Sequence, residues 1–310
     1  MTLNVLFAAK PERWKIYKPT LTRAFEERGL RVYLATDIAP EDVDYIVYAP
    51  NGDLQDFTPY TRTKAVLGLW AGVEDVVGNA TLTQPFARMV DDGLTRGMVE
   101  WVTGHVLRHH LGTDLHVHGQ DGEWRNHVPP LACDRPVTIL GLGALGAACG
   151  DALASLGFPV TGWSRSPKDL PNLTCKSGPK GLISALKTAE IVVLLLPLTD
   201  QTSCVLNTKT LALLPNGAVV INPGRGPLID DTALLHALNT GQLSHATLDV
   251  FRTEPLPKEH GFWSHPNITV TPHIASETRP LSASRVIAQN IERGETGKPL
   301  LHLVDRNLGY

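Results

Sequence analysis

The feature that most constrains the fold is a glycine-rich turn that directly follows a strand-like run. Val137–Leu140 is typical of a buried strand, and Gly141, Gly143 and Gly146 follow it at the spacing G-x-G-x-x-G. A helix rich in small residues is predicted next, over Leu145–Leu156. A strand, a glycine turn and a helix in this order predict a dinucleotide-binding unit of α/β architecture.

Each position in this turn has a predicted task. Gly141 permits the tight turn, Gly143 lets the backbone approach a pyrophosphate, and Gly146 lets the helix pack closely on the strand. The helix N-terminus supplies free N–H groups and a positive dipole, so Ala144 and Leu145 are expected to bind the cofactor as well. The alternative is a glycine turn that serves only the packing of strand and helix.

The end of the second strand predicts which dinucleotide is bound. A site selective for NAD carries Asp or Glu there, to accept a hydrogen bond from the ribose 2′-hydroxyl. This sequence has Trp163-Ser164-Arg165-Ser166 instead. The two serines can donate hydrogen bonds to a 2′-phosphate and Arg165 can pair with it, so NADP is predicted, with NAD as a possible second cofactor. An incidental arginine in a surface turn is the alternative interpretation.

Strand and helix patterns alternate along both halves of the chain. We expect a fold of two Rossmann- or flavodoxin-like doubly wound parallel-sheet domains with an active-site cleft between them. The substrate domain is predicted at residues 1–98 plus 282–310, and the NAD(P)-binding domain at 99–281. The predicted strands are Leu3–Ala8, Arg31–Ala35, Tyr45–Tyr48, Ala65–Trp70, Val137–Leu140, Pro159–Trp163, Ile191–Leu196, Ala218–Ile221, Ala246–Val250 and Ile268–Val270.

Composition narrows the classes of partner. The 310 residues carry a formal net charge of −3, which argues against a broad basic surface for nucleic acid or anionic membrane. The four cysteines are widely spaced and form no C-x-x-C pair, so we expect a reducing compartment. The segment Met1–Ala9 is predicted to be a first strand rather than a signal peptide, and no apolar run reaches the roughly 20 residues of a membrane span. A cytoplasmic protein with a small ligand is expected.

Three later segments resemble the D-isomer-specific 2-hydroxyacid dehydrogenases. They are Ile221-Asn-Pro-Gly-Arg225-Gly, Leu248-Asp-Val-Phe-Arg-Thr-Glu254-Pro-Leu-Pro and Thr271-Pro-His273-Ile-Ala-Ser276. The resemblance also covers Leu195-Leu-Pro-Leu-Thr199-Asp-Gln-Thr202, and it runs from about residue 66 to about residue 290. It implies hydride transfer between a nicotinamide cofactor and a 2-oxo acid.

The chemistry that this reaction needs matches three of these residues. Hydride delivery leaves negative charge on the carbonyl oxygen, so the site needs a proton donor there and a cation for the substrate carboxylate. His273 is predicted to be the general acid in reduction and the base in oxidation, with Glu254 holding its ring and favouring the imidazolium. Arg225 is predicted to bind the carboxylate and the carbonyl oxygen. Taken singly, each of these residues could be a surface loop residue.

The resemblance also implies contacts around this set. In the first domain, the loop Trp70-Ala71-Gly72 is expected to receive the substrate carboxylate on its backbone N–H groups, although Trp70 could serve packing alone. Asp249 is expected either to bind the nicotinamide carboxamide or to serve only the fold. The other residues expected along the cofactor are Leu196, Pro197, Thr202, Asn222, Pro223, Gly224 and Ser276.

Within the family, the chain looks most like the glyoxylate/hydroxypyruvate reductase A group, through its Trp-Ser-Arg-Ser segment and its short length. Glyoxylate and hydroxypyruvate are therefore the expected substrates, reduced with NADPH to glycolate and D-glycerate. Two alternatives stay open: a lactate- or phosphoglycerate-type dehydrogenase, and a dinucleotide-sensing binding protein like the corepressors of this fold.

A group of histidines suggests a metal site only weakly. His105 and His109 stand four residues apart on a predicted helix over Leu94–Leu111, but no H-E-x-x-H pattern completes a zinc site. We expect no metal, and we interpret these histidines as solvent-exposed or as part of an interface. Trp124, in the Gly-, His- and Pro-containing segment 112–136, is expected to pack on a second subunit of a homodimer or within its own chain.

Overall fold

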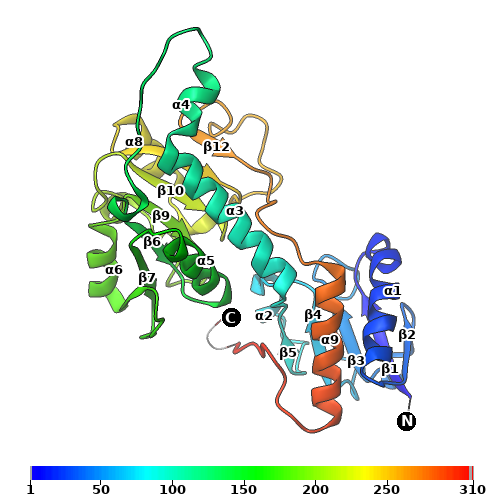
Figure 1. Ribbon diagram of the computed structural model, residues 1–310. Helices are drawn as coiled ribbons and strands as arrows, with labels where there is room; N and C mark the ends of the chain where they lie inside the picture. The colour runs from blue at the N-terminus through cyan, green and yellow to red at the C-terminus, as the bar shows by residue number, and fades with distance from the viewer. Residues whose placement is uncertain (1, 307–308, 310) are drawn as a thin grey trace. The chain divides into compact units, whose positions relative to one another are not determined.

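The computed structural model describes residues 2–306 and 309 and divides the chain into two compact units (Figure 1). Unit 1 comprises residues 1–94 and 277–310, and unit 2 comprises residues 95–276. The domain limits predicted after residues 98 and 281 lie inside helices α3 (Asp92–Leu111) and α9 (Pro280–Glu295). The two units are described separately below.

Unit 1 is built on a five-stranded parallel sheet in the order β2-β1-β3-β4-β5. The central strands β3 and β4 are buried along their whole length, as expected for a sheet covered on both faces. The strands are β1 (Leu3–Ala8), β2 (Val32–Ala35), β3 (Tyr45–Tyr48), β4 (Ala65–Gly68) and β5 (Phe86–Ala87).

Helices α1 (Pro11–Glu27) and α9 pack side by side on one face of this sheet, although they lie at opposite ends of the sequence (Figure 1). Buried side chains of both helices, Leu21 and Ile287 among them, share one core with the sheet. The other face packs against a second core that includes the short helix α2 (Glu74–Val77). A 3-10 turn, η1 (Pro40–Asp42), precedes β3.

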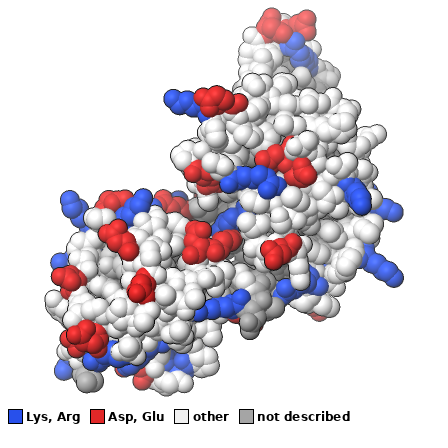
Figure 2. Space-filling view, turned by 180° about the vertical axis from the view of Figure 1, so that it is seen from behind, with Lys and Arg blue, Asp and Glu red and all other residues white. Residues whose placement is uncertain are grey.

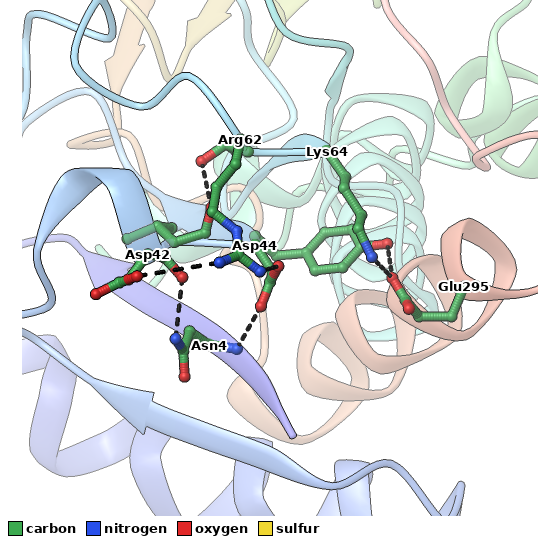
Figure 3. Close-up of polar contacts among 9 residues, drawn as sticks. Asn4, Asp42, Asp44, Arg62, Lys64 and Glu295 are labelled. Carbon is green, nitrogen blue, oxygen red and sulfur yellow. Dashed lines mark hydrogen bonds and ion pairs between the residues drawn. The ribbon is translucent and has the colours of Figure 1, made fainter. Parts of the chain in front are cut away.

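Polar contacts tie the C-terminal end of α9 to the amino ends of the strands (Figure 3). The Tyr45 hydroxyl donates to Glu295 Oε1 at 2.8 Å, and Lys64 Nζ donates to the same oxygen at 2.6 Å. Beside them, the buried Asp44 carboxylate accepts from the Asn4 backbone N–H and from the Arg62 guanidinium. Open α/β sheets bind ligands at the carboxyl ends of their strands, and this cluster lies at the opposite edge. Because its contacts join α9 to the strands, we assign it a structural role.

Unit 2 is built on a seven-stranded parallel sheet in the order β12-β11-β10-β9-β6-β7-β8. The chain starts in the middle at β6, runs outward to β8, and then returns to β9 on the other side of β6. The order therefore reverses between β6 and β9, which makes a topological switch point there. The strands are β6 (Val137–Leu140), β7 (Val160–Ser164), β8 (Thr174–Ser177), β9 (Ile191–Leu194), β10 (Ala218–Asn222), β11 (Leu243–Leu248) and β12 (Ile268–Val270).

Two hydrophobic cores lie on the two faces of this sheet. One contains Val102 and Val106 of α3 together with Cys149 of α5, and the other contains Leu234 and Leu238 of α8. The remaining helices are α4 (Thr113–His118), α5 (Ala144–Ser155), α6 (Gly178–Leu186), α7 (Thr208–Leu211) and α8 (Asp231–Asn239), with 3-10 turns η2 (Ala132–Asp134) and η3 (Gly226–Leu228).

Several predicted boundaries are corrected. The run predicted as a strand to Trp70 leaves the sheet after Gly68, and the run predicted to Leu196 leaves it after Leu194. Strand β11 ends at Leu248, which puts Asp249 in the loop beyond it. The edge strands β5 and β8 were not predicted, because β5 has two residues and β8 is half-exposed and polar. Helix α4 lies within the Gly-, His- and Pro-containing segment 112–136, for which no helix was predicted.

The interpretation of the helix histidines as solvent-exposed or interfacial is wrong for His109 and for the neighbouring His110, which pack against other parts of their own chain. His110 is buried, and half-buried His109 faces strand β11, where its Nε2 lies 2.8 Å from Thr247 Oγ1. The His245 ring lies 4.9 Å from the His109 ring, and its Nε2 lies 2.9 Å from Thr269 Oγ1. Half-buried His105 packs on the Trp101 ring. His109 and His245 are thus packed between α3 and the sheet of their own chain.

The surface carries charges of both signs. On the face shown in Figure 2, Lys and Arg side chains are interspersed with Asp and Glu side chains among the described residues. Within the described part of the chain, no helix is long and apolar enough to cross a bilayer. Among residues 2–306 and 309, no group of three or more His, Cys, Asp or Glu side chains could hold a metal ion.

Candidate active site

The glycine turn lies at the switch point of the unit 2 sheet, between β6 and α5. Gly141 has φ +111°, and a Cβ on it would lie 2.5 Å from the Leu195 carbonyl oxygen. A Cβ on Gly146 would lie 1.7 Å from the Gly141 carbonyl oxygen, so neither position admits a side chain. Gly143, in contrast, faces open space.

The first turn of α5 is suited to bind an anion. Gly143 is the N-cap, and no side chain caps the N–H groups of the helix start. Ala144 is exposed and Leu145 is half-buried, so their backbone N–H groups can be reached from outside. A pyrophosphate therefore fits this turn: the glycines leave room for it, and the free N–H groups can donate to it.

The three residues predicted to bind a 2′-phosphate at the end of β7 differ in their exposure: Ser164 is buried, whereas Arg165 and Ser166 are exposed. The Ser164 hydroxyl is buried and donates to the Ser166 carbonyl at 2.8 Å, so it shapes the turn. A contact between Ser164 and the 2′-phosphate stays a prediction. Arg165 and Ser166 are exposed at the tip of the turn, and Trp163 is anchored by its indole N–H to the Gly178 carbonyl.

The loop after β9 is held by Thr202. Its hydroxyl donates to the Pro197 carbonyl at 2.6 Å and accepts from the Thr199 backbone N–H at 2.8 Å. Leu196 is buried, and Pro197 is half-buried at the carboxyl end of the strand. Thr202 thus closes the loop with its own hydroxyl, and a contact between this loop and the cofactor stays a prediction.

Asn222 presents the arginine segment from the end of β10. Its buried side chain accepts from the Gly224 backbone N–H at 3.1 Å and donates to the Arg225 carbonyl at 2.9 Å. A Cβ on Gly226 would lie 2.1 Å from the Phe251 carbonyl carbon, so only glycine lets these two loops touch. Pro223 and Gly224 are buried, and Arg225 is half-buried between them and Gly226.

Glu254 and His273 meet at the end of β11 and β12. The His273 Nδ1 and Glu254 Oε2 atoms lie 2.6 Å apart, and Glu254 Oε1 accepts from the Phe251 backbone N–H at 2.9 Å. Half of the His273 side chain is exposed (50 %), so a substrate can reach the imidazole while the carboxylate holds Nδ1. The pair has the arrangement of a general acid with an orienting carboxylate.

Asp249 is enclosed by the loop that carries His273. Its carboxylate is fully buried and accepts from the Thr271 hydroxyl and from the backbone N–H groups of Ile274 and Ala275. The sequence motifs contain both Asp249 and Thr271, but no spacing rule predicted their contact. Contact between Asp249 and a cofactor stays a prediction, as does contact by Ser276, which is half-buried after Ala275.

Sequence reasoning assigned no role to Thr271, and it also assigned none to Arg252. Its guanidinium lies 3.4 Å from the Asp231 carboxylate and also donates to the Ile229 carbonyl. Arg252 thereby fastens the loop that carries Glu254 to the start of α8. Its place in the motif between Phe251 and Glu254 was the only available signal.

The predicted substrate loop of unit 1 follows β4. The Trp70 carbonyl accepts from the Met89 N–H at 2.9 Å, which joins this loop to the end of β5. Trp70 is 38 % exposed, while Ala71 and Gly72 are half-buried. The loop therefore lies at the carboxyl edge of the unit 1 sheet, where a ligand can approach it.

The glycine turn and the paired carboxylate and imidazole lie beyond the carboxyl ends of strands of one parallel sheet, an arrangement typical of a dinucleotide-dependent oxidoreductase. The model of the family "D-isomer specific 2-hydroxyacid dehydrogenase, NAD binding domain" matches residues 105–275. The chain belongs to the D-isomer-specific 2-hydroxyacid dehydrogenase family.

Relatives and solved structures of this family cover nearly the whole chain. The glyoxylate/hydroxypyruvate reductase A of Serratia proteamaculans is 36 % identical over 298 residues, which are 94 % of each chain. A family member from Xanthobacter autotrophicus, solved with NADPH, is 37 % identical with a TM-score of 0.94 over 100 % of both chains. The NADPH-dependent glyoxylate/hydroxypyruvate reductase of Sinorhizobium meliloti, solved with NADP, is 34 % identical with a TM-score of 0.86, covering 100 % and 99 % of the two chains.

Proposed function

We propose that this enzyme reduces small 2-oxo acids, with glyoxylate and hydroxypyruvate as its substrates and NADPH as its cofactor. The observation that carries the proposal is the 2.6 Å pair of His273 and Glu254 beside the loop that carries Arg225. The names of the Serratia and Sinorhizobium relatives support the choice of substrate. The absence of a carboxylate in Trp163-Ser164-Arg165-Ser166 supports NADPH.

Each residue of the set has one proposed task. Bound NADPH would supply the hydride, held by the free N–H groups of α5 and by Arg165. Arg225 binds the substrate carboxylate and places the carbonyl oxygen near the imidazole. Since Glu254 occupies Nδ1 of His273, Nε2 is the nitrogen that gives its proton to the carbonyl oxygen. Unit 2 is the cofactor domain in this proposal, and unit 1 supplies substrate contacts through Trp70, Ala71 and Gly72.

We also propose that two copies of the chain form a homodimer through the segment 112–136. This segment and the end of α3 expose large apolar side chains, whereas soluble monomers keep contiguous apolar patches small. Trp124 is 97 % exposed and Val128 is 80 % exposed. The other exposed apolar residues of the segment and the helix end are Leu111, Leu115, Val117 and Leu131.

The function is tested by following NADPH absorbance with glyoxylate, hydroxypyruvate, pyruvate and a phosphorylated 2-oxo acid. We expect the highest kcat/KM with the first two, and a fall of at least about 100-fold in His273→Ala and Arg225→Ala. Binding of NADPH, measured by its fluorescence, should persist in both variants.

The same assays separate the alternatives. Higher kcat/KM with pyruvate or with the phosphorylated acid would indicate a lactate- or phosphoglycerate-type enzyme. Tight NADPH binding without turnover of any 2-oxo acid would instead indicate a dinucleotide-sensing protein, and the proposed reaction would be wrong.

A further inference from the structure

The backbone of His273 is held in an uncommon conformation. Its φ is +54°, in the left-handed region that side-chain-bearing residues seldom adopt. Such a conformation persists only where the surroundings determine it, and it is frequent at functional sites. The contacts around the loop therefore show what keeps the imidazole in place.

Those contacts converge on a single residue, Asp249. The Asp249 carbonyl accepts from the His273 N–H at 2.8 Å. Its Oδ1 accepts from the Ile274 N–H at 2.8 Å, and its Oδ2 accepts from the Ala275 N–H at 2.8 Å. Three consecutive N–H groups of the loop thus donate to one fully buried residue.

Thr271 adds the side-chain contact on the other side of His273. Its hydroxyl donates to Asp249 Oδ1 at 2.6 Å, while its backbone N–H donates to the Leu248 carbonyl at 2.9 Å. A hydroxyl that donates to a carboxylate is a strong and directional contact. It holds the carboxylate in the orientation in which both oxygens accept from the loop.

We infer that Asp249 and Thr271 are positioning residues, which set the distance between the His273 imidazole and Glu254 and so the proton transfer. The inference rests on the proposed function of His273 as the proton donor. It differs from the prediction that Asp249 contacts the cofactor. If Asp249 and Thr271 position His273, their replacement lowers kcat, whereas loss of a cofactor contact would raise KM for NADPH.

The chain offers a matched pair of variants on strand β12 and its end. Thr271→Val removes the hydroxyl that contacts Asp249, and Thr269→Val removes the hydroxyl that lies 2.9 Å from His245 Nε2. Each variant replaces a hydroxyl by a methyl group, and the two positions are two residues apart. Only the Thr271 hydroxyl contacts Asp249, which holds the loop of His273. Thr271→Ser keeps the hydroxyl and serves as the conservative rescue.

The expected result is a fall in kcat of about 10-fold or more in Thr271→Val, with KM for NADPH unchanged, because misplacement of a reacting group lowers the rate of the chemical step. Thr269→Val should keep kcat within about 2-fold, and Thr271→Ser should recover most of it. A raised KM for NADPH at unchanged kcat would overturn the inference in favour of a cofactor contact.

A double-variant cycle tests whether Thr271 acts through His273. In the His273→Ala background, Thr271→Val should cause no further loss of the residual rate, since the group that it positions is gone. An equal fold-loss in both backgrounds means that the two residues act independently, and the inference then fails. The proposed function has its own test: it is wrong if the His273→Ala variant reduces the 2-oxo acid at the wild-type rate.

A crystal structure of Thr271→Val gives a readout that does not depend on activity. The inference predicts that His273 Nδ1 and Glu254 Oε2 lie beyond hydrogen-bonding distance in the variant, with the Ile274 or Ala275 contact to Asp249 lost. A retained separation near 2.6 Å contradicts it, whatever the kinetics.

Discussion

At the scale of single residues, the candidate site contains side chains that hold loops as well as the side chains predicted to act in catalysis. Asn222 and Asp249 are buried at the ends of neighbouring strands. The Asn222 side chain hydrogen-bonds the loop that carries Arg225, and the Asp249 side chain hydrogen-bonds the loop that carries His273. Gly226 lets two of these loops touch. The loops that carry Arg225 and His273 are thereby held by buried side chains at the ends of the strands.

Arg165 is exposed at the end of β7, where we propose that it pairs with the 2′-phosphate of NADPH. We expect Arg165→Ala to raise KM for NADPH about 10-fold, since a lost pairing with a phosphate is worth roughly 1.4 kcal/mol or more. KM for NADH, which lacks the 2′-phosphate, should stay unchanged. Steady-state kinetics with both cofactors measure this. Lys168→Ala, at a nearby exposed lysine, is the control, and an unaltered preference in Arg165→Ala would show that the assignment is wrong.

At the scale of elements, the packing of α3 on one face of the unit 2 sheet buries two histidines. Burial lowers the pKa of His109 to about 3, and repulsion from His245 and Arg108 adds to it. Burial likewise lowers the pKa of His245 to about 4, again with a contribution from Arg108. The carboxylate of Asp114 acts in the opposite direction on both. The folded protein therefore holds these imidazoles neutral in mild acid.

This packing predicts how stability depends on pH. The unfolded chain binds a proton at His109 below about pH 6.5, and the folded protein does not, so stability is complete above that pH and falls as the pH drops. From pH 7 to pH 5, wild type should lose about 2 kcal/mol more free energy of unfolding than His109→Gln. Urea unfolding at several pH values measures the difference. His116→Gln, at an exposed position on α4, should behave like wild type; equal pH profiles for wild type and His109→Gln would refute the prediction.

At the scale of the whole molecule, the chain passes from unit 1 to unit 2 within α3 and returns between Ser276 and Glu277. Beyond α3, the segment 112–136 leaves the sheet of unit 2 and exposes apolar side chains. An exposed tryptophan of this kind is typical of the residues that dominate protein interfaces. The state of association should therefore depend on this segment.

We expect sedimentation to give twice the chain mass of 33.7 kDa. Trp124→Glu should raise the dissociation constant of the dimer by more than about 10-fold, because it puts a charge at a position that the proposed dimer would bury. Tyr33→Glu changes an aromatic side chain that is 55 % exposed on the edge strand β2, and it should leave the mass unchanged. A wild-type mass near that of one chain would disprove the dimer.

The parts of the fold that follow from local pattern were predicted from the sequence. Strands such as Val137–Leu140 are buried on both faces, so apolar runs between glycines and helical patterns reveal them. The glycine turn was predicted from its spacing, and part of the reason is local: Gly141 has φ +111°, and a Cβ on Gly146 would meet the Gly141 carbonyl oxygen. The pairing of His273 with Glu254 was also expected, but from the resemblance to a family.

What the tertiary structure decided concerns contacts between loops that are distant in sequence. Thr271 and Asp249 are 22 residues apart, and no periodicity links them; they meet because β11 and β12 are neighbours whose carboxyl ends lie at one edge. His109 and Thr247 are 138 residues apart, so the burial that changes the histidine's charge was invisible in the sequence. Local conformation depends on neighbouring residues, whereas burial and the partners of a polar side chain depend on which strands pair.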